Sequence, residues 1–224
     1  MKNIVITGAS RGIGFELVKI FSNNNYNIIA LSRNISPTTG IKNVESFSTD
    51  LSSPNSIKKS IDFINSKFKS VDILINNAGK LLNKPFSETT FNDFKEVYSV
   101  NLFGLAELIR LLLPKLSSSS HVVNISSIGG LANTSKFPGL SAYSSSKGAL
   151  NILNEMLAEE YKETSIKFNT LALGAVQTEM LEEAFPGYNA PISSNEVSKF
   201  IFDFAINGSN FFNGKTIPVS SSNP

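Results

Sequence analysis

The sequence predicts one doubly wound α/β domain over residues 1–224, with a mostly seven-stranded parallel sheet and helices on both faces. Three observations lead to this fold class. Short runs rich in β-branched residues alternate with longer helix-like segments, which is typical of a parallel sheet. The strand-like runs are nearly continuous in apolar residues, as expected for strands buried on both faces. The 224 residues, 41% of them hydrophobic, suffice for one sizeable core.

The expected elements follow one another along the chain. The strand-like runs cover residues 3–7, 27–31, 44–47, 72–75, 121–125, 166–173 and 215–219. The helix-like segments cover residues 12–23, 54–69, 91–115, 141–163 and 194–207. Pro54 and Ser194 stand near two of the helix starts, where a first-turn proline and a serine cap are common.

Three segments are expected to be irregular. Between the second and third strands, Pro37 and Gly40 oppose a full helix, so we expect a loop or a single turn there. The polar residues 117–120, which follow Pro114, are predicted to form a short loop. The last residues, "SSSNP" at 220–224, are expected to fray.

Composition excludes several classes of function. A net charge of +2 is too small to argue for a nucleic-acid partner. The absence of cysteine excludes disulfides and thiolate metal sites and fits a reducing cytoplasm. The single histidine, His121, excludes histidine metal clusters, and we expect it to mark the entry of a strand. We find no signal peptide and no segment approaching the length of a membrane span, so we expect a cytoplasmic protein with no membrane partner.

A glycine-rich stretch, "ITGASRGIGFELVKIF", directly follows the first strand and opens the first helix. Gly8, Gly12 and Gly14 allow a tight turn and a close approach of backbone amides to a ligand. The N-terminus of a helix offers free N–H groups and a partial positive charge to a pyrophosphate. The spacing G-x-x-x-G-x-G departs from the common dinucleotide fingerprint. A glycine turn without a ligand is the alternative, but the strand–loop–helix context favours a bound dinucleotide.

A tyrosine and a lysine stand four residues apart at the start of the helix "YSSSKGALNILNEML". Residues at i and i+4 are neighbours on a helix surface, so Tyr143 and Lys147 can share one environment. Taken alone, the pattern is most simply two amphipathic side chains with their polar tips in water.

Five short motifs, in order, resemble those of the short-chain dehydrogenase/reductase family. They are "TGASRGIG" (7–14), "NNAG" (76–79), "NLFG" (101–104), "NISS" (124–127) and "YSSSK" (143–147). The match runs from residue 2 to about residue 180. The resemblance implies a Rossmann-fold oxidoreductase of the carbonyl reductase kind, which moves a hydride between a nicotinamide cofactor and a carbonyl/alcohol pair without a metal.

The resemblance also implies the roles of the catalytic residues. Tyr143 would be the general acid, and the Lys147 ammonium would favour its phenolate and hydrogen-bond the nicotinamide ribose. Ser127, rather than Ser126, would polarise the substrate carbonyl, because the family's serine usually lies three residues before a glycine, here Gly130.

Two further sets of residues follow from the resemblance. Asn101 would hold a water that connects the catalytic lysine to solvent. The residues expected to bind the cofactor are Gly8, Ser10, Arg11, Gly12, Ile13, Gly14, Arg33, Asp50, Leu51, Asn77, Ala78, Gly79, Tyr143, Lys147, Gly174, Val176 and Thr178.

The end of the second strand, "ALSRN", predicts which nicotinamide cofactor is used. NAD-binding relatives place an acidic residue there, about 20 residues past the glycines, to accept from the ribose 2′-hydroxyl. Here Ser32 takes that place, and Arg33 follows with a guanidinium suited to a 2′-phosphate. Arg11 could approach the same phosphate, and Asp50 is expected to lie beside the adenine. The prediction is therefore NADP(H), although both arginines could instead be simply solvated.

The chain departs from the family pattern near the expected substrate pocket. Ser127 and Tyr143 are sixteen residues apart, and the insert 131–141 is expected to loop over the pocket. Leu173 replaces the usual proline. The short substrate segment, 179–193, carries aromatic residues at 185 and 188 that could be lid contacts or loop anchors.

Assembly and alternative functions complete the predictions. The apolar faces of helices 91–115 and 141–163 predict a homodimer, and the lack of a Val-Asp-Gly-Gly ending makes a tetramer less expected. The alternative function is an NADP(H)-binding regulatory or signalling protein with little turnover, although the intact Asn/Ser/Tyr/Lys set favours an enzyme. A sugar-nucleotide epimerase is disfavoured by the glycine spacing and the short C-terminal region. The substrate and the direction of the reaction are left open.

Overall fold

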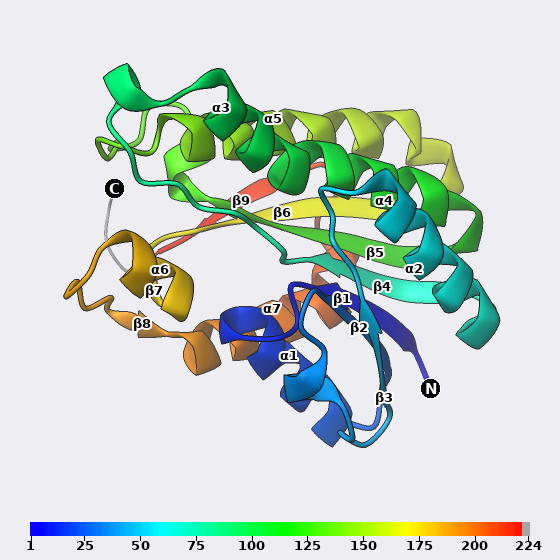
Figure 1. The fold of residues 1–224 in the computed structure, drawn as a ribbon. Coiled ribbons are helices and arrows are strands. Elements are labelled where there is room, and N and C mark those ends of the chain that lie inside the picture. Colours follow the sequence, from blue (N-terminus) through cyan, green and yellow to red (C-terminus); the bar gives the residue numbers. More distant parts are fainter. Residues whose placement is uncertain (221–224) are drawn as a thin grey trace.

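Seven parallel strands form the central sheet of the computed structural model, which describes residues 1–220 (Figure 1). The strands are β1 (Asn3–Thr7), β2 (Asn27–Ser32), β3 (Val44–Ser48), β4 (Val71–Asn76), β5 (Leu116–Ser127), β6 (Lys167–Leu173) and β9 (Thr216–Val219). Their order is β3-β2-β1-β4-β5-β6-β9, and every neighbouring pair is parallel. The predicted fold class is confirmed. Beyond Ser220, the expected fraying falls outside the described residues.

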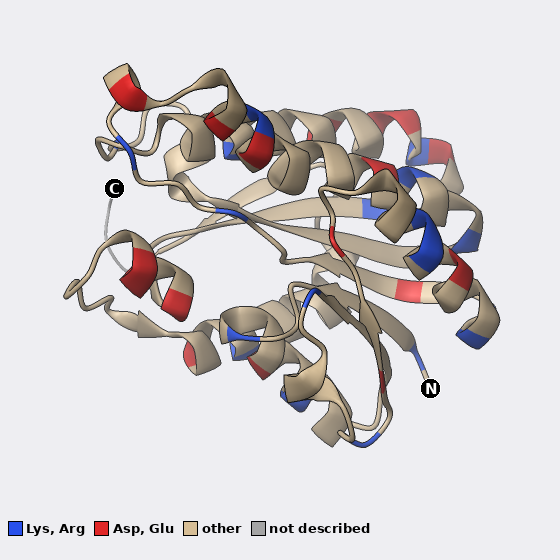
Figure 2. Ribbon diagram, viewed as in Figure 1, with Lys and Arg blue, Asp and Glu red and all other residues tan. Residues whose placement is uncertain are grey.

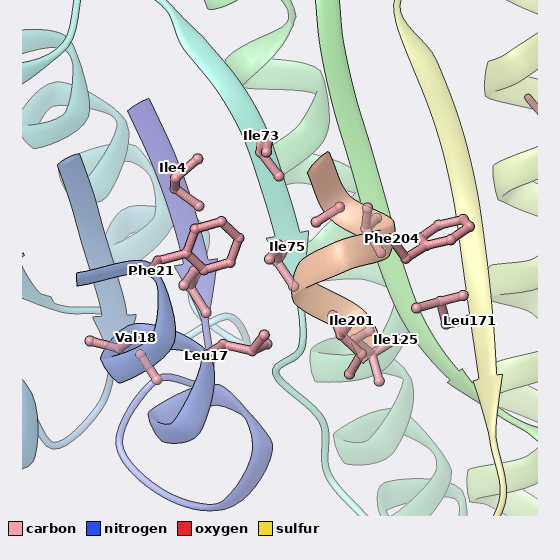
Figure 3. Close-up of a cluster of buried hydrophobic side chains, with 14 of the residues drawn as sticks. Ile4, Leu17, Val18, Phe21, Ile73, Ile75, Ile125, Leu171, Ile201 and Phe204 are labelled. Carbon is pink, nitrogen blue, oxygen red and sulfur yellow. The ribbon is translucent and has the colours of Figure 1, made fainter. Parts of the chain in front are cut away.

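Helices cover both faces of this sheet (Figure 1). On one face lie α1 (Gly12–Asn23) and α7 (Ser194–Asn207). On the other lie α2 (Pro54–Lys67), α3 (Phe91–Tyr98), α4 (Gly104–Leu112) and α5 (Ser141–Glu160). A hydrophobic core fills each of the two layers. Figure 3 shows the first of them, where side chains of α1 and α7 meet the isoleucines of β1 and β4.

The segment predicted as one helix over 91–115 is interrupted in the structure. Between α3 and α4, Ser99–Phe103 forms a π-helical turn, and Leu113–Lys115 is a 3-10 turn. At the junction, a Cβ added to Gly104 would lie 1.9 Å from the carbonyl oxygen of Leu51, so the helix passes very close to the chain after β3. The wide turn leaves Asn101 fully buried. Such turns often occur at functional sites.

The predicted loop at 117–120 is wrong, because β5 already begins at Leu116. The Ser120 hydroxyl donates to the carbonyl oxygen of Val71 at 2.6 Å, and the backbone N–H of Ser117 donates to the Ser120 oxygen at 2.7 Å. These bonds lie where the register between β4 and β5 shifts, so a serine side chain substitutes for backbone pairing at the irregularity. His121, expected at the strand entry, consequently lies inside the strand and is buried.

Local signals were otherwise close to the observed boundaries. Ser53 caps α2 ahead of Pro54, whereas α7 is capped by Ser193 instead of Ser194, in a capping box with Glu196. Between β2 and β3 there is a single 3-10 turn, Ser36–Thr38, as predicted. The short elements β7 (Val176–Gln177), α6 (Glu179–Ala184) and β8 (Ile192–Ser193) were not predicted. They form a separate arch beside one end of the sheet (Figure 1).

One helical stretch, Phe91–Lys115, is long and apolar enough to cross a membrane by length and composition alone. This corrects the expectation that no segment approaches such a length. The stretch packs within the fold, with α4 against α2 and α3 against α5. A helix that covers a sheet face passes the same test, so the finding is weak evidence for a membrane span.

Candidate active site

A cleft of about 2020 Å³ opens at the carboxyl ends of the strands. Its walls come from the ends of β1, β2, β4, β5 and β6, from the start of α5 and from the arch that contains α6. In doubly wound sheets, ligands bind in the crevice outside the carboxyl ends of the strands. The topology therefore brings the separate sequence motifs to one place.

The glycine-rich loop after β1 is shaped by close packing. Gly8 has a φ of +67°, and a Cβ added there would lie 2.8 Å from the Cα of Ala78. A Cβ on Gly14 would lie 2.2 Å from the carbonyl oxygen of Gly8. The Asn77 amide donates to the carbonyl oxygens of Thr7 and Gly8, each at 3.1 Å. Only glycine fits these positions, and the end of β4 holds the loop in its curved form.

This loop fits a dinucleotide phosphate. Arg11 is the N-cap of α1, and its side chain makes no capping bond, so the first turn of α1 keeps N–H groups for another acceptor. Gly12 has a φ of +53°, which brings bare backbone to the surface of the cleft. The site thus combines a helix N-terminus with unobstructed amides, which is the arrangement that binds phosphates.

The expected catalytic residues meet at the opposite wall. Ser127 ends β5, and its hydroxyl is hydrogen-bonded to the Tyr143 phenol. One turn along α5, the Lys147 ammonium lies 5.8 Å from the centre of the Tyr143 ring and donates to the Ile125 carbonyl oxygen at 2.8 Å. The Ser126 hydroxyl instead donates to the carbonyl oxygen of Lys147 at 3.3 Å. The structure therefore places Ser127, and not Ser126, against the phenol.

Glycine allows α5 to approach the end of β5. A Cβ added to Gly130 would lie 2.7 Å from the backbone nitrogen of Gly148 and from the carbonyl carbon of Lys147. The glycine three residues after Ser127 thus has a packing role, since it lets the first turns of α5 lie against the serine-bearing strand.

Burial dominates the titration of both catalytic groups. Desolvation raises the pKa of Tyr143 to about 12, although the hydrogen bond with Ser127 acts in the opposite direction. Burial lowers the pKa of Lys147 to about 8. Desolvation and the Ser127 hydroxyl alone determine the direction of the Tyr143 pKa, so the expected lowering of the phenol pKa by the ammonium is not seen. The phenol is therefore protonated at neutral pH, which is the form a general acid needs.

Asn101 connects the loop after β4 to α5 through hydrogen bonds of its side chain. Its amide nitrogen donates to the Lys80 carbonyl oxygen at 3.0 Å and to the Ser146 hydroxyl at 2.9 Å, and its oxygen accepts from the Lys80 N–H at 2.7 Å. Its oxygen and the Lys147 nitrogen would each lie 3.6 Å from a Cβ added at Gly79, so the two groups flank one small space. The role of Ser146 had no signal in the sequence. The water relay stays a prediction.

The end of β2 carries no carboxylate in the structure either. Ser32 is buried, and its hydroxyl donates to the Asn34 carbonyl oxygen at 2.7 Å. Arg33 is exposed and lines the cleft. Hydrogen bonds from the side chain and backbone of Ser52, followed by the charge of Arg33, lower the pKa of Asp50. This part of the cleft is therefore lined by the cationic side chain of Arg33 and by Asp50, whose carboxylate already accepts hydrogen bonds from Ser52.

The arch supplies contacts that the sequence did not reveal. Arg11, expected to approach a phosphate, donates both terminal nitrogens to the Glu183 carboxylate in α6. Phe185 and Tyr188 both line the cleft, which favours lid contacts over simple loop anchors. The acidic run "EMLEEAF" was the available signal for an ion pair, but the partner of Glu183, Arg11, lies 172 residues away along the chain.

The structure brings nearly all the expected site residues to the cleft. The exceptions are Gly14, which supports the loop from behind, and Asn101, which is buried. The predicted residues that line the cleft are Gly8, Ser10, Arg11, Gly12, Ile13, Arg33, Asp50, Leu51, Asn77, Ala78, Gly79, Ser127, Tyr143, Lys147, Gly174, Val176 and Thr178.

Comparisons with known proteins agree with this geometry. A sequence model of the short chain dehydrogenase family matches residues 2–189. The probable short-chain type dehydrogenase/reductase VdlC of Helicobacter pylori is 34% identical over 185 residues, which are 81% of this chain and 67% of that protein. The structure of 4-hydroxyisoleucine dehydrogenase complexed with NADH superposes with a TM-score of 0.88 at 26% identity, covering 99% of this chain and 98% of the other. A tyrosine-to-phenylalanine variant of ElxO with NADPH bound gives 0.86 at 27% identity, covering 98% and 97%.

Proposed function

Because this chain belongs to the short-chain dehydrogenase/reductase family, we propose that it is an NADP(H)-dependent oxidoreductase that transfers a hydride between the cofactor and a carbonyl/alcohol substrate. The observation that carries the proposal is the contact of Ser127 with Tyr143 beside Lys147, in the same cleft as the glycine loop. We assign the substrate contacts to the loop 128–142 and the segment 179–193, and we place the reaction in the cytoplasm.

The protein groups supply proton transfer and charge stabilisation. A bound nicotinamide dinucleotide supplies the hydride in reduction and accepts it in oxidation. Ser127 holds the substrate oxygen next to Tyr143, whose O–H bond breaks as a new O–H bond forms on the substrate. The Lys147 ammonium then stabilises the phenolate that remains. In the direction of oxidation, the phenolate takes the proton back.

Replacement of one hydroxyl tests this assignment. Tyr143→Phe should lower kcat by about 10²–10⁴-fold, the usual contribution of general acid catalysis, and leave folding and cofactor binding nearly intact. Tyr161→Phe, the same change at the other end of α5, is the matched control and should keep full activity. Turnover by the Tyr143 variant at nearly the wild-type rate would show that another group is the acid.

A substrate screen separates the enzyme from the regulatory alternative. NADPH oxidation is followed spectroscopically against ketones, quinones, aldehydes, β-ketoacyl thioesters and pterins, together with a binding titration of the cofactor. We expect turnover with at least one class. Tight cofactor binding without turnover across the whole panel would favour the regulatory alternative.

The surroundings of Arg33 support NADP(H) over NAD(H). No carboxylate follows β2 to accept from a ribose hydroxyl, and the Ser32 hydroxyl is already used within the chain. A charge-assisted contact between Arg33 and a 2′-phosphate is worth about 1.5–3 kcal/mol, or roughly ten- to a hundredfold in affinity. Arg33→Ala should therefore raise KM for NADPH and leave that for NADH unchanged, whereas Arg110→Ala, on the surface of α4, should change neither. Equal kcat/KM of the wild type for both cofactors would refute the assignment.

An exposed apolar face supports a homodimer. Phe103 is 57% exposed, Ile152 60% and Met156 59%, and all three belong to the helical layer of α3, α4 and α5. Large apolar side chains exposed on one helical layer favour an interaction surface there. We expect light scattering at micromolar concentration to give the mass of a dimer, and Ile152→Asp to give a monomer. Phe211→Asp, at a similarly exposed phenylalanine near β9, is the control; a monomeric wild type would refute the dimer.

A further inference from the structure

Arg11 and the short helix α6 meet at the rim of the cleft, and the mechanism above does not use this contact. Nη1 and Nη2 of Arg11 donate to the two carboxylate oxygens of Glu183, the second bond measuring 3.1 Å. The two side chains are 46% and 62% exposed. The pair lies in water, so either partner can be exchanged for another ion.

A second carboxylate of α6 faces the same loop. A Cβ added at Gly12 would lie 3.4 Å from Oε2 of Glu179 and 3.3 Å from the methyl group of Thr178. The hydrogen bond with Glu183, and then the charges of Glu183 and Glu179, raise the pKa of Arg11. Figure 2 shows the acidic residues along α6. Two anions therefore stand beside the loop that is shaped to receive a phosphate.

The same end of α6 is also tied to the opposite wall, because Ala184 directly follows Glu183. The Asn83 amide donates to the Ala184 carbonyl oxygen at 2.8 Å. Helix α6 thus bridges the cleft, from the glycine loop on one side to the chain after β4 on the other. Loss of the Arg11 contact would free α6 from the glycine loop at Glu183 and leave the Asn83 bond to Ala184 in place.

We propose that Glu183 competes with the phosphate groups of the dinucleotide for Arg11, and that cofactor binding thereby releases α6 from the glycine loop. This rests on the proposed cofactor site. A guanidinium fork fits a carboxylate and a phosphate with the same geometry, so only one of them can occupy the Nη1–Nη2 edge. Glu183 is a positioning residue that acts through Arg11: it lowers the affinity for the cofactor and favours the contact of α6 with the glycine loop until the cofactor binds.

Calorimetric titration with small probes tests the competition. The probes are 5′-ADP, which carries the pyrophosphate, 2′-AMP, which carries the 2′-phosphate, and adenosine, which carries neither. An exposed ion pair corresponds to at most about a fivefold change in an equilibrium constant. Glu183→Gln should bind one phosphorylated probe roughly two- to fivefold more tightly than the wild type, and the probe that tightens identifies the phosphate reaching Arg11. Adenosine should be unaffected.

Glu182→Gln is the matched control. It removes the same charge from the same helix, but the Glu182 carboxylate accepts from the backbone N–H of Gly187 at 3.0 Å instead of pairing with Arg11. Its affinities should equal those of the wild type. In an Arg11→Gln background, Glu183→Gln should have no effect on phosphate affinity, because the residue through which it acts is gone.

The release of α6 has its own readout, cleavage by chymotrypsin after Phe185 or Tyr188. The phosphorylated probe should speed cleavage of the wild type, and Glu183→Gln should be cleaved at the faster rate without any ligand. Weaker phosphate binding by Glu183→Gln would mean that Glu183 presents Arg11 to the phosphate, and would overturn the proposal. Unchanged affinity and cleavage would overturn it too. A wild type that binds neither phosphorylated probe would refute the dinucleotide site itself, which is a distinguishable failure.

Discussion

Acidification should destabilise the protein through its single histidine. His121 is 1% exposed, and its Nδ1 lies 3.0 Å from the carbonyl oxygen of Ala205. Because a carbonyl only accepts, Nδ1 carries the hydrogen, and Nε2 accepts from the Asn169 amide at 3.0 Å. A second proton, on Nε2, would point at the N–H group of the Asn169 amide, so protonation of the ring would break this hydrogen bond. Burial, and to a smaller extent the charge of Lys2, lower the pKa of His121 to about 4 against the opposing effect of the Ala205 bond.

The lowered pKa of His121 sets the magnitude and the sign of the change in folding stability with pH. The ordinary pKa of a histidine is 6.5 and that of His121 in the folded protein is about 4, a difference that corresponds to about 3 kcal/mol of stability. The folded pKa is the depressed one, so the unfolded chain binds more protons between these values. The stabilisation is complete above pH 6.5 and is lost as the pH falls toward 4. About 2 kcal/mol should be lost by pH 5, a large part of a typical folding free energy.

Urea unfolding followed by circular dichroism, at pH 7.5 and at pH 5, measures this loss. His121→Phe is the comparison, because it keeps a ring against Phe204, whose centre lies 5.5 Å from that of the imidazole, but cannot titrate. The variant should be less stable at pH 7.5, since it leaves Asn169 without its partner, yet its stability should change little down to pH 5. A wild type equally stable at both pH values, or a variant that shows the same loss, would refute the reasoning.

Three further outcomes follow from the geometry of the site. Gly14→Ala would place a methyl group 2.2 Å from the Gly8 carbonyl oxygen, so the cofactor loop must distort; we expect about 1–3 kcal/mol lower stability by urea unfolding and weaker binding of NADPH by titration. Gly139→Ala, at a φ of +85° and 2.0 Å from the Asn83 side-chain oxygen, should raise KM for the carbonyl substrate while the Kd for NADPH stays constant, and an unchanged KM would contradict this. The rate of carbonyl reduction should fall as the pH rises through about 8, because Lys147 loses its charge there; a flat profile from pH 7 to 9 would argue against its role.

The parts of this protein that the sequence determined are those encoded within a few neighbouring residues. The periodicity of the apolar runs located the seven strands of the sheet and most of its helices, because side-chain direction repeats with the period of each element. The strand–glycine–helix order of 3–23 specified a phosphate loop, and the spacing of Tyr143 and Lys147 placed them on one helix face. Each of these inferences needs only local backbone geometry.

Features that depend on distant segments were decided by the tertiary structure. Ser120 lies in β5 because its hydroxyl donates a hydrogen bond to the carbonyl oxygen of Val71 in the neighbouring strand β4. The pKa of Tyr143 rises because the surrounding chain removes part of the hydration of its phenol, and this desolvation cannot be seen in a motif of five residues. Arg11 points to Glu183 because the arch after β6 folds back over the first loop. Partners separated by more than a hundred residues meet only through packing, so their identity, and with it the charge that each group carries, is a property of the folded chain.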